Sequence, residues 1–424
     1  CVDVNPAIIE RLQRGEATIH EPGLQELLQL AKPHLTFTRS LPDLVGDVVV
    51  VIAVGTPPKD NGDADLAYVD VAAKQIAERI QPDANVVIVN KSTVPIGSAR
   101  HVAAIVERAL AARDVRAGVS VVSNPEFLAE GRAVRDSLFP DRIVVGADDP
   151  NAIETLRRLY QPLLEQVFDP PPSTPRPDRL PLPPLVTTTP TSAELTKYAA
   201  NAFLATKISF INEFAGLAER VGADITQVAR AIGIDDRIGP RFLHAGIGWG
   251  GSCFGKDTRA ILAAASGYDY AMPVVQAAVD VNYLQRVKIV EKVQEHLKVL
   301  RGTTVGVLGL AFKGDTDDLR DAPALTVIGV LAERGANVRV HDPIAMPGAR
   351  AIDPPLPVTY ADDPVTLAQG CDALVIATDW TQYRSLDFGA IAEAMRGDVL
   401  VDARNLVDPD EVRARGLRYV GVGR

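Results

Sequence analysis

Short apolar runs that alternate with helical patterns constrain the fold of this chain more than any other feature of its sequence. Within residues 1–146 these runs read DVVVVIAVG (47–55), NVVIVNKS (85–92), VSVVSNP (119–125) and RIVVG (142–146). Each is bounded by Gly, Pro, Asp or Asn, and continuous apolar runs between helices are typical of buried parallel strands. The pattern predicts an α/β domain with a doubly wound parallel sheet.

The same alternation returns near the other end, in TTVGVLGLAF (303–312), NVRVHDP (337–343), DALVIATDW (372–380) and DVLVDARN (398–405). Residues 192–298 between them lack strand signals. They predict a long helix over 192–222, ended by Gly222, and a second over 272–297 with an apolar stripe of Val274, Ala278, Val281 and Leu284. This second helix is a candidate connector and dimer seam.

We therefore expect three domains: a Rossmann-like domain over 1–189, a central helical domain over 190–299 and a second Rossmann-like domain over 300–424. The stretch 167–191 holds so many prolines that few backbone N–H groups remain for a sheet. It predicts an exposed loop or linker, although a proline-rich ligand segment is an alternative.

The two Rossmann-like halves share a further feature, an acidic residue at the end of a strand. VRVHDP ends with Asp342 about 30 residues after a Gly-containing turn, and CVDVNP at the start of the chain has Asp3 in the matching place. In a Rossmann unit this acidic residue follows the phosphate-binding Gly loop and holds the ribose hydroxyls. We therefore expect Asp3 to hold the ribose of a dinucleotide, and roughly 30 residues carrying the first strand and the Gly loop to precede Cys1. Without that segment, weak dinucleotide binding is expected.

Composition excludes several classes of function. The net charge of −10 argues against broad nucleic-acid binding, which needs a basic face. The sequence contains no run of 18 or more apolar residues, so it predicts no transmembrane helix. The three cysteines, far apart, form neither a disulfide framework nor a metal cluster, which fits a reducing cytoplasm.

The stretch GIGWGGSCFGKD (246–257) carries the strongest chemical signal. Its glycines let the backbone approach a ligand closely, and Cys253 stands at the start of a helix, where the pKa of a thiol is depressed. Cys253 is either a nucleophile or a small buried hydrophobe. Asp257, at or near the N-cap, is either a catalytic group or only the cap.

Other candidates lie on a helix and on two loops. Lys197 and Asn201 are four residues apart in an apolar helix, so both can be directed at an oxyanion, unless they belong to a solvated face. Thr93, Glu126 and Glu130 follow strands, where α/β sheets bind ligands. The glutamates are candidate acid/base groups or simply solvated.

The chain resembles the nucleotide-sugar 6-dehydrogenase family over essentially its whole length. Eight blocks in order carry the resemblance: EPGL (21–24), VGTP (54–57), KSTVP (91–95), NPEFLAEG (124–131), ELTKYAANAFLATKISFINE (194–213), DRIGPRFLHAGIGWGGSCFGKD (236–257), AFKGDTDDLRDAP (311–323) and VDARN (401–405).

The resemblance implies an NAD-dependent, four-electron oxidation of UDP-glucose to UDP-glucuronate in a homodimer or larger homo-oligomer. Cys253 would be the nucleophile, Lys197 and Asn201 would stabilise oxyanions, Glu126 would act as acid and base, and Thr93 and Asp257 would position a water. The residues that would line NAD are Asp3, Thr56, Thr93, Glu130 and Arg320. Those that would hold the sugar nucleotide are Phe127, Leu128, Lys197, Arg237 (from the neighbouring subunit), Phe242, Gly250, Ser252, Lys313 and Arg404.

Three positions depart from the family pattern: Gly255 replaces a usual Pro, His244 a frequent Lys, and Trp249 a common Phe that still suits stacking. UDP-N-acetylmannosamine and GDP-mannose are alternative substrates. GGSCFGKD argues against the former, whose dehydrogenases usually carry His before the Cys and lack the Lys-Asp pair. A hydroxyacid or phosphogluconate-type dehydrogenase needs no Cys, and a non-catalytic binding protein needs no nucleophile.

Overall fold

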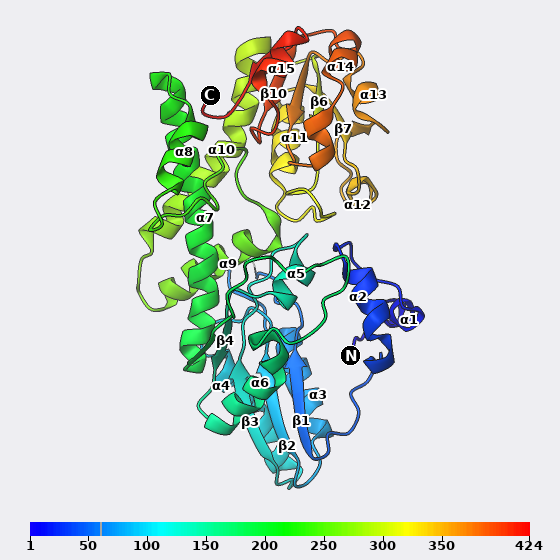
Figure 1. Cartoon of the computed structure of the whole chain (residues 1–424), viewed down its shortest axis with the longest axis vertical. Helices are drawn as coiled ribbons and strands as arrows, with labels where there is room; N and C mark the ends of the chain where they lie inside the picture. The colour runs from blue at the N-terminus through cyan, green and yellow to red at the C-terminus, as the bar shows by residue number, and fades with distance from the viewer. Residues whose placement is uncertain (60–61) are drawn as a thin grey trace. The chain divides into compact units, whose positions relative to one another are not determined.

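The computed structural model describes residues 1–59 and 62–424, and the chain divides into two compact units. The first comprises Cys1–Ala200 with Arg259–Tyr270, and the second comprises Asn201–Thr258 with Ala271–Arg424. The long helix α7 (Pro190–Val221) contributes to both units (Figure 1). Among the described residues, no helix combines the length and apolar character needed to cross a membrane.

The first unit contains one sheet of five strands in the order β1-β2-β3-β4-β5. The strands are β1 (Asp47–Ile52), β2 (Asn85–Asn90), β3 (Gly118–Ser123), β4 (Ile143–Gly146) and β5 (Leu185–Thr188). The first four fall on the four apolar runs, so the predicted strands are confirmed. All neighbours are parallel except β3 and β4, which meet antiparallel at one residue pair, Ser123 and Gly146.

Helices cover both faces of this sheet, as a doubly wound fold requires (Figure 1). On one face α3 (Ala67–Arg79) and α4 (Ser98–Ala112) pack on Val86 and Ile88 of β2. On the other face α6 (Pro150–Leu164) packs on Val89. The side chains of β2 alternate between the two cores because successive residues of a strand point to opposite faces.

Further helices of the first unit are α1 (Pro6–Arg14), α2 (Leu24–Ala31), the 3₁₀ turn η1 (Lys32–His34) and α5 (Ala133–Leu138). The expected strand end at residues 1–4 is reduced to an isolated bridge between Val2 and Thr38.

The Pro-rich stretch was predicted to contain no strand, and β5 corrects that prediction. Residues 185–188 read LVTT and contain no proline, so their backbone N–H groups remain available to pair with β4. Gly146 at the end of β4 admits the start of α7, because a Cβ there would stand 2.6 Å from both Thr189 O and the Ala193 Cβ.

The second unit contains a parallel sheet of six strands in the order β11-β10-β9-β6-β7-β8. The strands are β6 (Thr304–Leu308), β7 (Asn337–His341), β8 (Val358–Tyr360), β9 (Ala373–Ile376), β10 (Val399–Asp402) and β11 (Arg418–Val420). The chain starts in the middle, winds outward to β8, and then returns to β9 on the other side of β6. This is the strand order of a Rossmann fold, with its switch point between β6 and β9.

The helices of the second unit pack around this sheet and beside it (Figure 1). They are α8 (Ile225–Gly233), α9 (Gly251–Gly267, shared with the first unit), α10 (Pro273–Leu297), α11 (Pro323–Glu333), α12 (Met346–Arg350), α13 (Pro364–Ala368), α14 (Phe388–Ala394), α15 (Pro409–Ala414) and the 3₁₀ turn η2 (Thr381–Ser385). One continuous core joins the sheet to the second half of α7 and to α10. The three-domain boundaries stay a prediction.

The apolar stripe expected on α10 is partly wrong. Ala278 is buried, but Val274 and Leu284 are 67% and 54% exposed. The buried line is displaced around the helix and includes three polar side chains, Asn282, Gln285 and Arg286.

Candidate active site

Three loops leave the carboxyl ends of β1, β2 and β3 in the first unit, which is the edge where α/β sheets bind ligands. Thr56, after β1, is buried and donates its hydroxyl to the carbonyl of Thr93, after β2, at 2.7 Å. Ser92 donates to the carbonyl of Val54 at 2.7 Å. The loops after β1 and β2, which carry two of the predicted site residues, are therefore held together.

The loop after β3 meets α7 through an ion pair. The Nζ of Lys197 lies 2.7 Å from Oε1 of Glu126, and the Lys197 side chain is only 4% exposed. The other oxygen of Glu126 accepts a hydrogen bond from the backbone N–H of Leu128 at 2.6 Å. Lys197 also lies 5.6 Å from the centroid of the Phe127 ring. The structure thus brings together two predicted catalytic residues and places Phe127 beside them.

A second lysine, which the sequence analysis missed, lies near this pair. Lys91 donates to Oδ1 of the fully buried Asn124 at 3.2 Å and contacts the hydroxyl of Tyr160 at 3.5 Å. Burial lowers the pKa of Lys91, and the neighbouring Glu126 opposes that shift. The KSTVP block contains this lysine, but nothing in the sequence indicates that Tyr160, on α6, lies against it.

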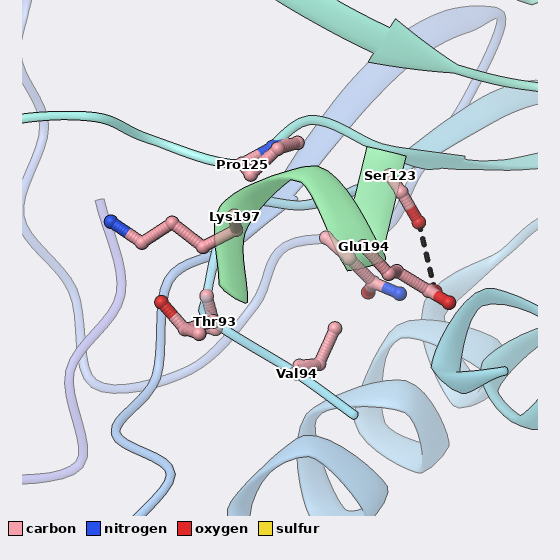
Figure 2. A pocket seen from close by; sticks show the side chains of 8 residues that line it. Thr93, Val94, Ser123, Pro125, Glu194 and Lys197 are labelled. Atoms are coloured by element: carbon pink, nitrogen blue, oxygen red, sulfur yellow. Dashed lines mark hydrogen bonds between the residues drawn. The ribbon is translucent and has the colours of Figure 1, made fainter. Parts of the chain in front are cut away.

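Glu194 is another functional candidate that the sequence analysis missed. It stands one turn before Lys197 on α7, is 3% exposed, and accepts hydrogen bonds from the backbone N–H groups of Gly97 (2.6 Å) and Ala99 (2.9 Å) and from the Ser123 hydroxyl (3.0 Å). Figure 2 shows Glu194 and Ser123 at the wall of a hollow that Thr93 and Lys197 also line. Burial raises the pKa of Glu194, against the hydrogen bonds that lower it.

The EPGL block has a structural task. Both carboxylate oxygens of Glu21 accept backbone hydrogen bonds from the loop after β3, one from Gly131 at 2.8 Å and one from Ala133 at 2.7 Å. Glu130, predicted to line NAD, lies directly before Gly131. Glu21 therefore fixes the far end of the loop that begins with Glu126.

The matched acidic residues Asp3 and Asp342 have different surroundings. Asp3 is half-buried and its carboxylate accepts the backbone N–H of Asn5 at 2.8 Å. Asp342 is fully buried and accepts from the backbone N–H groups of Leu310, Ala311, Ile344 and Ala345 and from the indole of Trp380. In the second sheet, backbone N–H groups and an indole already occupy this carboxylate. Asp342 therefore stabilises the fold and does not bind a ribose.

In the second unit, Asn201 and Asp257 are bonded to each other. The amide of Asn201 donates to Oδ2 of Asp257 at 2.6 Å, and Lys256 lies 3.0 Å from the other carboxylate oxygen. Both Asn201 and Asp257 are buried, at 7% and 1% exposed. The alternatives of a solvated face for α7 and a cap for Asp257 are wrong, because α9 begins six residues earlier, at Gly251.

Cys253 is the third residue of α9, as predicted, so it stands in the first helical turn, whose backbone N–H groups have no partner within the helix. It is half-buried, and its Sγ lies 3.6 Å from the hydroxyl of Ser252. Cys371 provides the contrast: it is fully buried, and burial raises the pKa of its thiol to about 11. Of these two residues, Cys253 is the one that stands at a helix N-terminus.

The Gly-rich loop before Cys253 is clamped through its backbone. Asn282 of α10 accepts from the N–H of Trp249 (2.8 Å) and donates to its carbonyl (3.0 Å), and Arg286 donates to the same carbonyl at 2.7 Å. Gly246 is held by Asn212 of α7 and Gln285 of α10. The sequence analysis missed these polar residues, although polar side chains within an apolar helical pattern are a usable signal for them.

Trp249 was expected to stack on a ligand, but its ring is not available for this. It is 6% exposed, its indole N–H donates to the Ser209 hydroxyl at 3.1 Å, and its ring meets that of Phe254 edge to face at 6.1 Å. Phe242 lies on the other side of Phe254, at 6.3 Å between ring centroids. These aromatic residues form the wall behind the loop.

The remaining predicted ligand residues lie at the second sheet and on an outer loop. Arg404, after β10, donates to the carbonyls of Ala377, Gly248 and Phe312, which joins the Gly-rich loop to the ends of the strands. Lys313 lies over the Phe312 ring, and Arg320 pairs with Asp318 at 2.8 Å. Arg237 is 88% exposed and pairs with Asp235.

Two Rossmann-like sheets, ligand loops at their carboxyl ends and a cysteine at a helix N-terminus are the attributes of a dinucleotide-dependent oxidoreductase. Comparison with known protein families identifies the family within this class. Three models of one family match successive parts of the chain: its NAD binding domain over residues 1–164, its central domain over 191–283 and its UDP binding domain over 306–409. The chain belongs to the UDP-glucose/GDP-mannose dehydrogenase family.

Individual relatives agree. The chain is 42% identical to UDP-glucose 6-dehydrogenase TuaD of Bacillus subtilis and 43% identical to a UDP-glucose 6-dehydrogenase of Pseudomonas aeruginosa, with 100% of this chain aligned to 87% and 92% of those proteins. Among solved structures, a UDP-glucose dehydrogenase from Pyrobaculum islandicum is 40% identical with a TM-score of 0.84, and covers 100% of this chain and 91% of its own.

Proposed function

We propose that this enzyme oxidises UDP-glucose to UDP-glucuronate with two NAD⁺ and one water, through a thioester on Cys253. The observation that carries the proposal is the bond between Asn201 and Asp257, one turn beyond a cysteine at a helix N-terminus. A binding protein or a two-electron dehydrogenase needs no nucleophilic cysteine with a bonded amide and carboxylate beside it. The similarity to UDP-glucose 6-dehydrogenases supports glucose as the sugar.

The first sheet suits NAD. Its loops at the carboxyl ends offer hydroxyl and carboxylate groups, the chemistry that ribose and nicotinamide recognise, from Thr56, Thr93 and Glu130, with Asp3 and Arg320 as further candidates. When bound, NAD⁺ accepts the hydride in each of the two oxidations.

Cys253 takes the central part. Once C6 of the sugar has reached the aldehyde level, the thiolate adds to it and forms a thiohemiacetal, and the second oxidation gives a thioester. The negative oxygen that develops on C6 needs hydrogen-bond donors placed in advance. Lys197 and Asn201, one turn apart on α7 and both buried, supply an ammonium and an amide on one face of that helix.

Hydrolysis of the thioester needs a water and a base. Asp257 contacts Asn201 and Lys256. Together with Thr93 it would position the water. Glu126 takes a proton from that water when Lys197 turns from it to the oxyanion. Breaking the C–S bond returns the thiolate of Cys253 and releases the carboxylate product.

The second sheet holds the nucleotide. Arg404, Lys313, Gly250 and Ser252 would hold the diphosphate and the sugar, with Phe242, Phe127 and Leu128 as apolar contacts. Arg237 is exposed and pairs with its neighbour Asp235. In the proposed assembly it would serve the site of a neighbouring subunit. UDP-N-acetylmannosamine and GDP-mannose are the substrates that a test must exclude.

We further propose a homodimer or larger assembly in the cytoplasm. From Phe203 onward, α7 carries exposed apolar side chains along one stripe, namely Phe203, Phe210, Phe214, Leu217 and Val221, and α10 adds Val274, Tyr283 and Leu284. A second copy of the chain would cover them.

The yield of NADH per sugar nucleotide tests the reaction. Two NADH per UDP-glucose, with UDP-glucuronate as product, is the expected result. One NADH would indicate a two-electron dehydrogenase, and none a binding protein. UDP-N-acetylmannosamine and GDP-mannose, assayed in parallel, should react at least 100-fold more slowly.

A further inference from the structure

A small hollow opens behind Thr93 and Lys197 in the first unit. Its walls come from the end of β2, the loop after it, the end of β3 and the first turns of α7, and its space is comparable to that of one water molecule. Figure 2 shows Thr93, Val94, Ser123, Pro125, Glu194 and Lys197 around it. Asn90 and Ser92 complete the lining.

Asn90 is the reason to expect a ligand here. It is the last residue of β2 and is 1% exposed, yet both polar atoms of its side chain have no hydrogen-bond partner among the residues that the structure describes. A primary amide has two donor hydrogens and an acceptor oxygen, and leaving them unpaired away from bulk water is unfavourable. A polar molecule in the hollow would satisfy them.

Glu194 also lines the hollow. Its Oε1 accepts from Ala99 N–H and the Ser123 hydroxyl, and its Oε2 accepts from Gly97 N–H. Each carboxylate oxygen has two lone-pair positions, so Oε2 retains one. The free lone pair of Oε2 can accept a hydrogen bond from a donor. The Asn90 amide needs a donor for its oxygen and an acceptor for its NH₂ group.

Water meets these needs better than other ligands. It donates two hydrogen bonds and accepts two, and a buried water typically joins about three polar groups. An anion is disfavoured by the Glu194 carboxylate. A cofactor or sugar fragment is too large to reach an amide that is 1% exposed.

We propose that Asn90 and Glu194 bind one ordered water molecule in this hollow, and that this water positions Thr93 and Lys197 for catalysis. Asn90 begins the loop that leads to Thr93, and Glu194 stands one turn before Lys197. The water would therefore fix the loop after β2 against the first turns of α7. It differs from the water that hydrolyses the thioester, and it takes part in no bond-making step. Its catalytic consequence rests on the proposed roles of Thr93 and Lys197.

Asn90→Leu tests the proposal, because leucine has a similar size and no polar atoms. Loss of a water-bridged amide should lower the urea midpoint of unfolding and reduce kcat at least fivefold, with KM changed less than twofold. Asn85→Leu, at the exposed start of the same strand, controls for leucine in β2. A raised midpoint in Asn90→Leu would overturn the proposal, since removing an unpaired buried amide stabilises a protein. An unchanged kcat would overturn the positioning role.

A double-mutant cycle with Glu194→Gln tests the bridge. In the Glu194→Gln background, Asn90→Leu should lower kcat less than twofold, because the shared water is already lost. Equal fold-losses in both backgrounds would overturn the bridge. If Glu194→Gln does not fold, the crystal structure of the full chain decides: density for a water within 3.2 Å of the Asn90 amide and Glu194 supports the site, and density-free space or a ligand atom overturns it. The urea midpoint and the electron density are both measured without substrate. They therefore test the water site independently of the proposed reaction.

Discussion

Lys197 and Glu126 form an ion pair with 2.7 Å between Nζ and Oε1, and only 4% of the lysine side chain is exposed. Removing one member of such a pair leaves the other charge in a poorly hydrated place. Two proposed catalytic groups therefore restrain each other until a substrate separates them.

Lys197→Ala should lower kcat by roughly 10²-fold, because an oxyanion donor typically contributes a few kcal/mol to the transition state. KM for UDP-glucose should change far less. Steady-state kinetics check this expectation, with Lys207→Ala as a control at another lysine of the same helix. An effect confined to KM would make Lys197 a substrate-binding residue.

Cys253→Ala should abolish formation of UDP-glucuronate, because the thioester cannot form. Cys253→Ser should accumulate an ester-linked adduct, since an alkoxide leaves less readily than a thiolate. Mass spectrometry of the intact protein after mixing with UDP-glucose and NAD⁺ detects it. Cys371→Ala is the matched control, because that thiol is buried and its pKa is raised to about 11. Normal turnover by Cys253→Ala would show that Cys253 is not the nucleophile.

Glu21→Gln should weaken NAD binding about tenfold. A glutamine has one carbonyl oxygen, so it cannot accept both backbone N–H groups of Gly131 and Ala133, and a lost charge-assisted bond corresponds to about 1.5 kcal/mol or more. Glu26→Gln, which alters a single hydrogen bond to Ser173 in the same region, is the control. Calorimetric titration with NAD⁺ measures the affinity of both variants. If Glu21→Gln binds NAD⁺ as tightly as wild type, Glu21 does not support the cofactor-binding loop.

The stability of the protein should depend on Glu194 in a defined direction of pH. Burial raises its pKa above the ordinary 4.5, so the folded state holds the proton more tightly than the unfolded state. Its contribution is complete below pH 4.5 and is lost as pH rises through the raised pKa, at up to about 1.4 kcal/mol per pH unit. Urea unfolding of wild type and Glu194→Gln between pH 4.5 and 8 should show the difference falling as pH rises. A difference that grows with pH would contradict this.

Phe214→Glu should break the proposed assembly. Phe214 is 42% exposed on α7, and its ring lies tilted beside that of Phe210, with 4.7 Å between centroids. In the proposed assembly a carboxylate at this position would be buried against the partner. Sedimentation at micromolar concentration should give a dimer or larger species for wild type and for Glu213→Gln, the neighbouring control, and a monomer for Phe214→Glu. A fully active wild-type monomer would refute the proposal.

Strands of four or more residues with a continuous apolar run were predictable from the sequence, because burial on both faces forces that composition. β8 and β11 were missed: each has three residues, as VTY and RYV, too short for a pattern. β5 was missed because the prolines around it outweighed the four residues that pair. Local composition indicates a strand only where the strand is long enough to dominate its window.

The candidate site was predictable where chemistry and spacing are local. The start of a helix at Cys253 and the shared face of Lys197 and Asn201 follow from helical periodicity. The partners of those residues do not. That Asn282 and Arg286 turn toward the Gly-rich loop depends on how α10 is rotated in its packing, and the apolar pattern suggested a different rotation.

The clamp on the Gly-rich loop touches main-chain atoms alone, at Gly246 and Trp249, and this has a consequence for divergence. A change of side chain in the loop leaves every clamping hydrogen bond in place, so mutation can alter what the loop recognises without altering its course. The glycines are the exceptions, since Gly248 and Gly251 have φ of 105° and 83°. Ile247 and Trp249 are also buried, at 0% and 6% exposed, so selection for a different sugar is left with Ser252 while α7 and α10 preserve the backbone of the loop.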